Sequence, residues 1–254
     1  MQTPSEILFE VRGSCALITI NRPEQRNAIN LAACAQIEQA FRRFDSDPRL
    51  RVAILTGAGD KAFSAGRDLK EIAAQGEAPI PLLPTLGDTM HVSKPVIAAV
   101  NGVAIAGGWV FAQMCDLCIA ADNATFGITE PKLGRGVAWS PPMIHMIGSR
   151  LALELMLTGK TISAQRAYEI GFVNRVVPRA ELIPAALTMA DEIVECAPLS
   201  VIAVRQVVRH TLNMGLDAAL EVGKQVCAPL AVSEDAIEGA TAFKEKRKPR
   251  WKGR

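Results

Sequence analysis

The chain of 254 residues is long enough to bury a sizeable core, and its 49% hydrophobic and 21% charged residues are typical of a globular protein and not of a disordered one. Its net charge of +2 favours neither nucleic acid nor a membrane surface as a partner. The sequence shows no apolar run of about 18 residues and no export or organelle signal, so we expect a cytoplasmic protein with no membrane partner.

The first half of the chain alternates between strand and helix patterns. "ILFEVRG" and "CALITIN" flank a Gly13-Ser14 turn and predict a hairpin. Next comes a helix capped by Asn30, whose predicted buried face consists of Leu31, Cys34, Ile37, Ala40, Phe41 and Phe44. Further strands are predicted at "VAILTG", 95–100, "LCIAA" and "ATFGI", and a mobile loop over a short helix from about residue 73 to 84.

From about Ser140 onward, helical spacing dominates. It predicts helices over 180–196, 199–213 and 216–226, and "FVNRVV" is the only stretch there that reads as a strand. No linker rich in Gly or Ser separates two independent units, so the helical part should pack on the core or on neighbouring subunits. We therefore divide the chain into a core, residues 1–195, and a C-terminal helical region, residues 196–254.

The six cysteines and three histidines do not suggest a metal site. Cys115 and Cys118 form a lone C-x-x-C without a second pair or a nearby histidine, which favours buried, reduced thiols over a metal or redox role. We expect no metal and no cofactor.

Two glycine turns follow buried strands in the first half. In "AIAGGWVFAQMCD" the glycine pair opens an apolar helix, and in "LTGAGDKAFSAGRDL" an Ala-Gly step leads into a short helix. Glycine inside a helix costs about 0.5–1 kcal/mol relative to alanine, so such pairs are expected where the backbone must approach something closely. Two turns of this kind could each present one backbone N–H to the same negatively charged oxygen.

Six segments, taken in order, resemble blocks of the crotonase, or enoyl-CoA hydratase/isomerase, family. They are "NRPEQRNAIN", "LTGAGDKAFSAGRDL", "KPVIAAVNGVAIAGG", "MCDLCIAADNATFGITEPKLG", "LTGKTISAQRAYEIGFVNRVVP" and "AFKEKRKPRWKG". The resemblance implies an α/β fold, a spiral of ββα turns with two roughly perpendicular sheets and a helical C-terminal trimerisation region. It also implies a homotrimer or a homohexamer built as a dimer of trimers, with no nucleic-acid partner.

The resemblance further implies an acyl-CoA thioester as the substrate, with coenzyme A as part of that substrate. The thioester oxygen would be held by the backbone N–H groups of Ala65 and Gly107. Matching positions place Arg26, Ala28, Gly66, Arg67, Asp68, Leu69 and Lys246 among the residues that bind the CoA portion. The basic C-terminal block, where residues 244–254 carry seven Lys or Arg and one Glu, would lie near the adenosine 3′-phosphate, in some members across a subunit interface.

Hydratases of the family use two glutamates, and this sequence keeps one. The helical position three residues after Gly107 is Val110, whereas the second position is kept as Glu130 in "FGITEPKLG". A single carboxylate can remove a proton from one carbon and return it to another, as the isomerases of the family do. Unusual residues around the expected acyl pocket, Trp109, Val110, Trp139 and Met143, suggest an unusual acyl group.

Three interpretations remain open. The presence of a single acid is best explained by isomerisation of an enoyl-CoA, with Glu130 as the only acid–base residue. Hydration, or hydration followed by C–C cleavage, would need another group to activate water. A catalytically inactive acyl-CoA-binding protein would keep the oxyanion hole only for recognition. Ser64 has no G-x-S-x-G surroundings, and neither a His nor an Asp is placed to complete a triad, so hydrolase chemistry is not expected.

Overall fold

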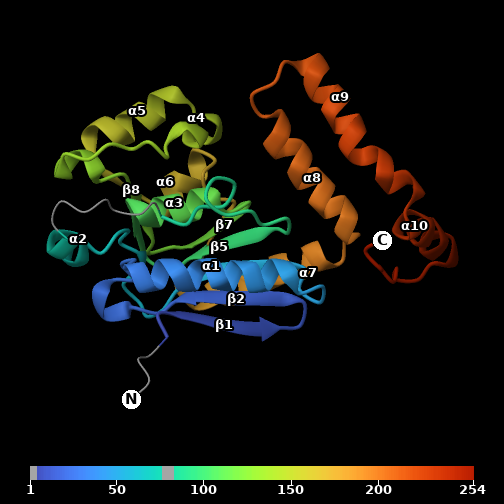
Figure 1. Ribbon diagram of the computed structural model, residues 1–254, viewed down its shortest axis with the longest axis horizontal. Helices are drawn as coiled ribbons and strands as arrows, with labels where there is room; N and C mark the ends of the chain where they lie inside the picture. The colour runs from blue at the N-terminus through green and yellow to red at the C-terminus, as the bar shows by residue number, and fades with distance from the viewer. Residues whose placement is uncertain (1–4, 76–82) are drawn as a thin grey trace.

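The computed structural model describes residues 5–75 and 83–254, and its strands form two sheets (Figure 1). The larger sheet has six strands in the order β1-β2-β3-β5-β7-β10. Its first pair is an antiparallel hairpin, and every later strand lies parallel to its neighbour. Their bounds are Ile7–Arg12, Cys15–Ile20, Val52–Gly57, Val96–Val100, Leu117–Ala121 and Arg175–Val177.

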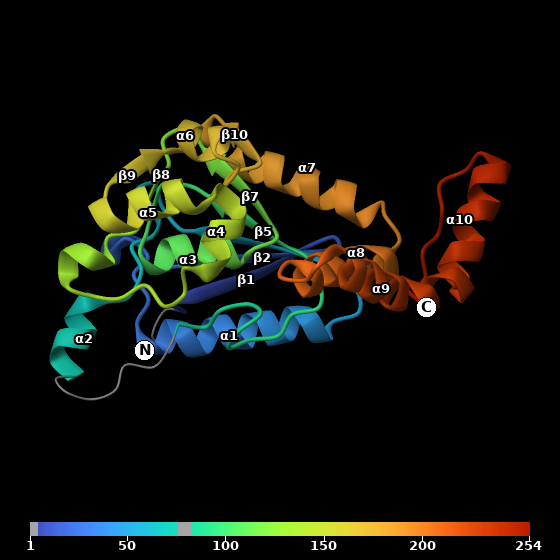
Figure 2. The same ribbon diagram turned by 90° about the horizontal axis from the view of Figure 1, so that it is seen from above.

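Both faces of this sheet are covered, which explains why its central strands are apolar at successive positions. On one side, alternate residues such as Ile18 and Leu55 pack with helix α1 (Leu31–Ser46). On the other side, the intervening residues, such as Leu17 and Ile54, pack against helix α7 (Leu182–Val194). The sheet therefore lies between these two helices (Figure 2).

The smaller sheet has four very short strands in the order β4-β6-β8-β9. They are Ala62–Ser64, Val103–Ile105, Thr125–Gly127 and Thr161–Ser163. Along the chain, β3 is followed by β4, β5 by β6 and β7 by β8, so each unit contributes one strand to each sheet. This repeated step confirms the expected spiral of β, β and α elements, although the expectation named none of β4, β6 and β9.

Helices fill the remaining layers. The short helix α2 (Leu69–Gln75) follows β4, helix α3 (Gly107–Met114) follows β6, and the 3₁₀ turn η2 (Glu130–Leu133) follows β8. Residues 76–82 of the loop expected over α2 lie outside the described part of the chain. Helix α6 (Ala164–Glu169) packs on β8 and β9 of the small sheet, helix α5 (Ser149–Thr158) contacts η2, and helix α4 (Pro141–Ile147) packs against α5. None of the helices in the described part of the chain is long and apolar enough to span a bilayer.

Helices α8 (Pro198–Thr211), α9 (Leu216–Cys227) and α10 (Glu234–Glu245) extend from one end of the core (Figures 1 and 2). Their attachment centres on Asp116, just after α3. Its carboxylate accepts from Arg205 at 2.7 Å and from Arg209 at 3.0 Å, both on α8, and from the Val96 N–H at 2.9 Å. This half-buried ion cluster ties the C-terminal helices to the larger sheet.

One detail of the predicted helical face is wrong. Helix α1 begins after Asn30, whose side chain accepts from the Ala33 N–H as a cap, and five of the six residues expected on its buried face are buried. The exception is Leu31, which is 39% exposed. Leu31 is the first residue of the helix, and Ala33, which is completely buried, takes the inward position in this turn instead.

Candidate functional site

The segments expected to carry the chemistry follow three neighbouring parallel strands of the small sheet. Ala65 comes directly after β4, Gly107 two residues after β6, and Glu130 three residues after β8. Strand β6 pairs with both β4 and β8 in parallel. Since the carboxyl ends of parallel strands share one edge of a sheet, the three segments lie side by side there.

The two glycine turns are packed directly against each other. A Cβ atom on Gly66 would lie 2.7 Å from the Gly107 nitrogen, and one on Gly107 would lie 3.0 Å from the Gly66 Cα. Gly66 also has φ of +84°, a conformation that L side chains rarely adopt. A Cβ on Gly108 would lie 2.0 Å from the Ser64 carbonyl oxygen. The glycine pair is thus needed for backbone contact between the turns.

The backbone amides at these turns are not equally free. Within the described part of the chain, the Gly107 N–H at the start of α3 has no hydrogen-bond partner, as expected for the first turn of a helix. The Ala65 N–H, by contrast, donates to the Arg26 carbonyl at 3.0 Å. The residue before Gly107, Ala106, is an alanine with φ of +51°, held by its N–H bond to the Gly127 carbonyl at 3.0 Å.

Glu130 is a buried carboxyl, only 8% exposed, and is positioned by η2. Burial raises the pKa of Glu130 above its ordinary value, and backbone hydrogen bonds and the Trp139 indole oppose this shift only in part. Its Oε1 accepts from the Trp139 Nε1–H at 3.2 Å, whereas its buried Oε2 has no partner within the described residues. A buried carboxyl with one free oxygen and a raised pKa is suited to proton transfer.

The helix that begins at Gly107 supports the tryptophan that contacts Glu130. Gln113 donates from Nε2 to the Trp139 carbonyl at 3.1 Å and accepts at Oε1 from the Trp109 indole at 3.2 Å. The Trp109 ring is stacked on Phe172 with centroids 4.3 Å apart. No sequence motif marks Gln113, a glutamine that bridges two tryptophans.

The four residues expected around the acyl pocket occupy different environments. Val110 and Met143 are buried, with 3% and 0% exposure, and Trp139 is half-buried beside Glu130. The Trp109 side chain is completely buried in an aromatic cluster with Phe126 and Phe172.

Several residues expected to bind the CoA portion form one connected loop system. The Arg22 guanidinium donates to the Ala28 carbonyl and pairs with Asp68 at 2.9 Å. Although burial opposes it, this pairing, together with N–H groups of α2, lowers the pKa of Asp68. Asp68 therefore caps α2 and fixes the loop. Leu69 begins α2 and is 48% exposed.

Arg67 and Arg26 complete this group. The Arg67 backbone bridges to Ile29, and its Nη1 contacts the Cys34 sulfur at 3.5 Å. The Arg67 Nη2 is buried and has no partner within the described residues. Arg26 is exposed and contributes its carbonyl oxygen, described above, to the Ala65 turn.

Two buried polar residues hold the same turns together. The Ser64 hydroxyl donates to the Asn27 carbonyl at 2.8 Å and accepts from the Gly66 N–H at 3.1 Å, a structural arrangement unlike that of a nucleophile. The Asn27 side chain donates to the carbonyls of Ala58 and Ala62 and accepts from the Arg22 N–H. No sequence pattern singles out Asn27, whose role depends on contacts between distant loops.

Lys246 lies far from Glu130 within one chain. It ends α10 with φ of +54°, and α10 and α2 lie at opposite ends of the molecule (Figure 1). Its basic neighbours are already paired, Arg247 with Glu238 at 2.6 Å and Lys248 with Glu195 at 2.9 Å. Any contact of Lys246 with a ligand at the glycine turns must therefore come from another copy of the chain.

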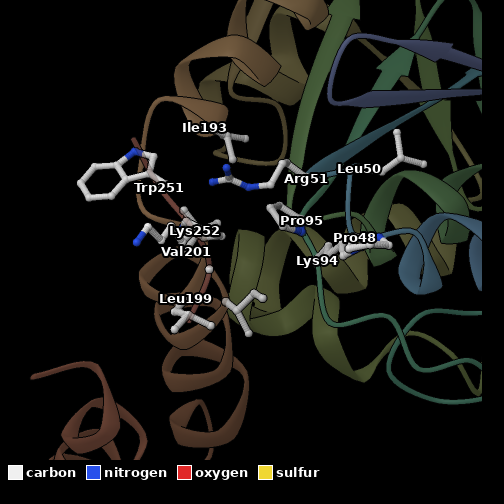
Figure 3. Close-up of a pocket in the computed structure, with 13 residues that line it drawn as sticks. Pro48, Leu50, Arg51, Lys94, Pro95, Ile193, Leu199, Val201, Trp251 and Lys252 are labelled. Carbon is white, nitrogen blue, oxygen red and sulfur yellow. The ribbon is translucent and has the colours of Figure 1, made fainter. Parts of the chain in front are cut away.

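A cavity of about 290 Å³ lies elsewhere, between the core and the C-terminal helices (Figure 3). Its walls include Leu199 and Trp251 and three basic residues, Lys252, which pairs with Glu234 at 2.8 Å, and the cations Arg51 and Lys94. Arg51 donates to the Cys196 carbonyl at 2.7 Å, and Lys94 donates to the Asp47 carbonyl at 2.7 Å. Arg51 and Lys94 thus both donate to backbone carbonyl groups near helix ends. None of the residues expected to act on a substrate lines the cavity.

The cysteine pair is structural. Cys115 and Cys118 are buried, and burial raises the pKa of both thiols, that of Cys118 to about 12. Among the described residues, no group of three or more His, Cys, Asp or Glu side chains is arranged to hold a metal ion.

Comparisons with known proteins agree along the whole chain. The family model described as enoyl-CoA hydratase/isomerase matches residues 10–254. The carnitinyl-CoA dehydratase of Escherichia coli is 42% identical over 265 residues, covering 98% of this chain and 100% of the relative. That of Proteus mirabilis is 40% identical over 257 residues, covering 96% and 97%. The crystal structure of an enoyl-CoA hydratase from Mycobacterium marinum matches with a TM-score of 0.92 and 39% identity, covering 98% of this chain and 100% of that one.

Proposed function

The chain belongs to the enoyl-CoA hydratase/isomerase family, and on that basis we propose that it acts on an enoyl-CoA thioester with Glu130 as its single acid–base residue. The observation that carries this proposal is the state of Glu130, which is buried, has a raised pKa and has an Oε2 without a hydrogen-bond partner among the described residues. The helix position where a second glutamate is expected holds Val110, which cannot transfer a proton.

In the proposed reaction, the ionised Glu130 removes a proton from C2 of a 3-enoyl-CoA, the carbon between the thioester carbonyl and the C=C bond. The electron pair of the broken C–H bond delocalises onto the thioester oxygen. The free Gly107 N–H stabilises the resulting negative charge, and a fixed donor of this kind is worth about 3 kcal/mol in the transition state. Protonated Glu130 then returns its proton to the other end of the allyl system, which moves the double bond.

The second oxyanion donor needs a local adjustment. The Ala65 N–H donates to the Arg26 carbonyl in the free chain, so the thioester oxygen must share this N–H or replace that carbonyl as its acceptor. Gly107, whose N–H has no partner among residues 5–75 and 83–254, is therefore the principal donor in this proposal.

Hydration or hydration followed by cleavage is the second candidate, and the names of the relatives favour it, since they are a carnitinyl-CoA dehydratase and enoyl-CoA hydratases. A hydratase would need a group other than residue 110 to activate water. Val110→Glu separates the two candidates. In an isomerase it should introduce hydration of a short 2-enoyl-CoA, measured by loss of the conjugated absorbance. No gain in a folded variant would mean that water does not reach this position.

An inactive acyl-CoA-binding protein is the third candidate, and the buried Glu130 disfavours it. Nothing in a purely binding site requires a carboxyl to be held there against its desolvation cost. The turnover assay described below decides this point, since a binding protein would convert none of the substrates offered.

We also propose a trimer or a dimer of trimers. Apolar side chains are exposed on each of the last three helices, and their burial between copies would stabilise an assembly. They are Val204 and Val208 on α8, Leu216 and Leu220 on α9, and Ile237 and Phe243 on α10.

The test is product analysis on 2-enoyl-CoA, 3-enoyl-CoA and an aromatic enoyl-CoA, with Glu130→Gln as the matched variant. We expect turnover of the 3-enoyl substrate to fall at least about a hundredfold in Glu130→Gln while acyl-CoA still binds, because only proton transfer is removed. Unchanged turnover in the variant would show that a residue other than Glu130 transfers the proton.

A further inference from the structure

The two oxygens of Glu130 have different surroundings. Oε1 accepts from the Trp139 indole N–H at 3.2 Å, and Oε2 is buried without a partner within the described residues. A carboxyl that is hydrogen-bonded through one oxygen cannot rotate freely about its last bond. The other oxygen is then the one available to exchange a proton with a bound molecule.

Trp139 is itself held from behind. Its carbonyl accepts from the Gln113 amide at 3.1 Å, and the Gln113 oxygen accepts from the Trp109 indole at 3.2 Å. Trp109 is fully buried and stacked on Phe172, so this chain of hydrogen bonds begins in a close-packed part of the core.

The same helix carries both the anchor and the oxyanion donor. Gln113 and Trp109 belong to α3, which starts at Gly107. One helix therefore carries the Gly107 N–H and, through Gln113 and Trp139, a hydrogen-bonded link to the Glu130 carboxyl. Such coupling matters because catalytic groups must keep their mutual geometry within about 0.5 Å.

We infer that Trp139 is the positioning residue of Glu130: its indole N–H fixes Oε1 and leaves Oε2 to carry the proton, and Gln113 and Trp109 fix Trp139. This inference rests on the proposed role of Glu130 in proton transfer. The indole also stabilises the ionised carboxylate, in agreement with its opposing effect on the raised pKa of Glu130.

Trp139→Phe in the full chain tests the inference, because phenylalanine keeps an aromatic ring and loses the N–H. The protonation midpoint of Glu130 is read from the protonated-carboxyl stretch in pH-difference infrared spectra, assigned by its loss in Glu130→Gln. We expect the midpoint to rise by about half a unit to one unit, since the charged form loses a hydrogen bond. The acid limb of the kcat/KM profile should move by the same amount, and kcat should fall more than KM rises.

The matched control is Trp251→Phe. Trp251 also donates its indole N–H, to the Glu195 carbonyl at 2.7 Å, but in the C-terminal tail. This control should leave the Glu130 midpoint and the acid limb where they are. An equal shift in both variants, or no shift in Trp139→Phe, overturns the inference.

A second variant, Gln113→Met, leaves the Trp139 side chain intact and removes its anchor. We expect a shift in the same direction but smaller, and this variant decides the matter if Trp139→Phe does not fold. The two proposals fail separately. If Glu130→Gln is fully active but Trp139→Phe moves the midpoint, only the proposed function is wrong. If Glu130→Gln is inactive and neither variant moves the midpoint, only the role of Trp139 is wrong.

Discussion

Glu130 should lower the stability of the folded chain while it serves the reaction. A buried carboxyl is costly to ionise, and burial raises the pKa of Glu130 from its ordinary value of 4.5. Between 4.5 and the raised value, the folded protein binds more protons than the unfolded chain. Stability at this site is therefore greatest at low pH, falls as the pH rises through that window, and stays reduced above it.

Glu130→Gln should consequently stabilise the protein at pH values above the pKa of the folded state. We expect a higher free energy of unfolding and a higher Tm near pH 8, and no gain near pH 4, where the wild-type carboxyl is protonated in both states. Thermal unfolding at the two pH values measures this. Glu195→Gln, at an exposed carboxyl paired with Lys248, is the control and should bring no gain. A variant less stable than the wild type near pH 8 would contradict the argument.

The sequence identified Glu130 and the glycine pair, but not the hydrogen bonds that fix them. The glycines and the carboxyl belong to motifs with a fixed spacing, so they can be recognised in the sequence. The bond from Trp139 to Glu130 depends on how η2 and the segment after it turn back, and the bond from the Ala65 N–H to Arg26 depends on a distant loop. Such contacts follow from tertiary structure and cannot be read from spacing.

The two glycines of α3 have separable roles at the level of the secondary-structure elements. A Cβ on Gly107 would meet the Leu83 Cδ1 at 2.6 Å, the end of a flexible side chain, and the Gly66 Cα at 3.0 Å. A Cβ on Gly108 would meet the Ser64 carbonyl oxygen at 2.0 Å, and this oxygen belongs to strand β4. The first clash can be relieved in part, whereas the second must push α3 away from the small sheet.

Gly108→Ala should therefore destabilise the protein by about 3 kcal/mol or more, and Gly107→Ala by less. Gly107→Ala should instead lose most of its activity, because its methyl group separates the two turns at the oxyanion position. Urea unfolding and turnover are measured on both variants. Equal losses of stability in the two variants would show that the contacts of Gly107 and Gly108 contribute equally to packing.

The small sheet was the least predictable element of the fold. Strands β4, β6 and β9 have three residues each, too few to show an alternating pattern, and their pairing partners define them. The long strands and helices were found because the apolar residues in each recur at the spacing typical of a strand or of a helix. The residues of the candidate site come directly after these short strands in the chain. They were therefore found from the chemistry of the glycine turns and from the family resemblance, not from strand patterns.

Within one molecule, Lys246 lies far from the glycine turns where the CoA ester is expected to bind. If the assembly brings a neighbour's Lys246 to the CoA phosphate, Lys246→Ala should raise KM for the CoA ester several-fold with little change in kcat. A pantetheine ester, which lacks the nucleotide, should be affected less. Arg42→Ala, at an exposed arginine on α1 that pairs with Glu38, is the control. Equal effects on both esters would assign Lys246 to folding or assembly.

The exposed face of α9 gives a second prediction at this scale. Leu216 and Leu220 are 74% and 55% exposed, and replacing both with aspartate should dissociate the assembly by placing charges in its interface. Sedimentation velocity measures the outcome. Val11→Asp, at a residue 51% exposed on β1, is the control and should leave the assembly intact. A double variant that sediments like the wild type would exclude this face as an interface.

The strand order of both sheets has a consequence for biosynthesis. In each sheet the strands lie side by side in the order in which the ribosome makes them, so every new strand can add to a finished edge. The face that includes Leu17, Ile54 and Ile97 remains uncovered until α7 has been made. Nascent chains stalled before residue 182 should therefore recruit holding chaperones, and release from them should coincide with the emergence of α7 from the exit tunnel.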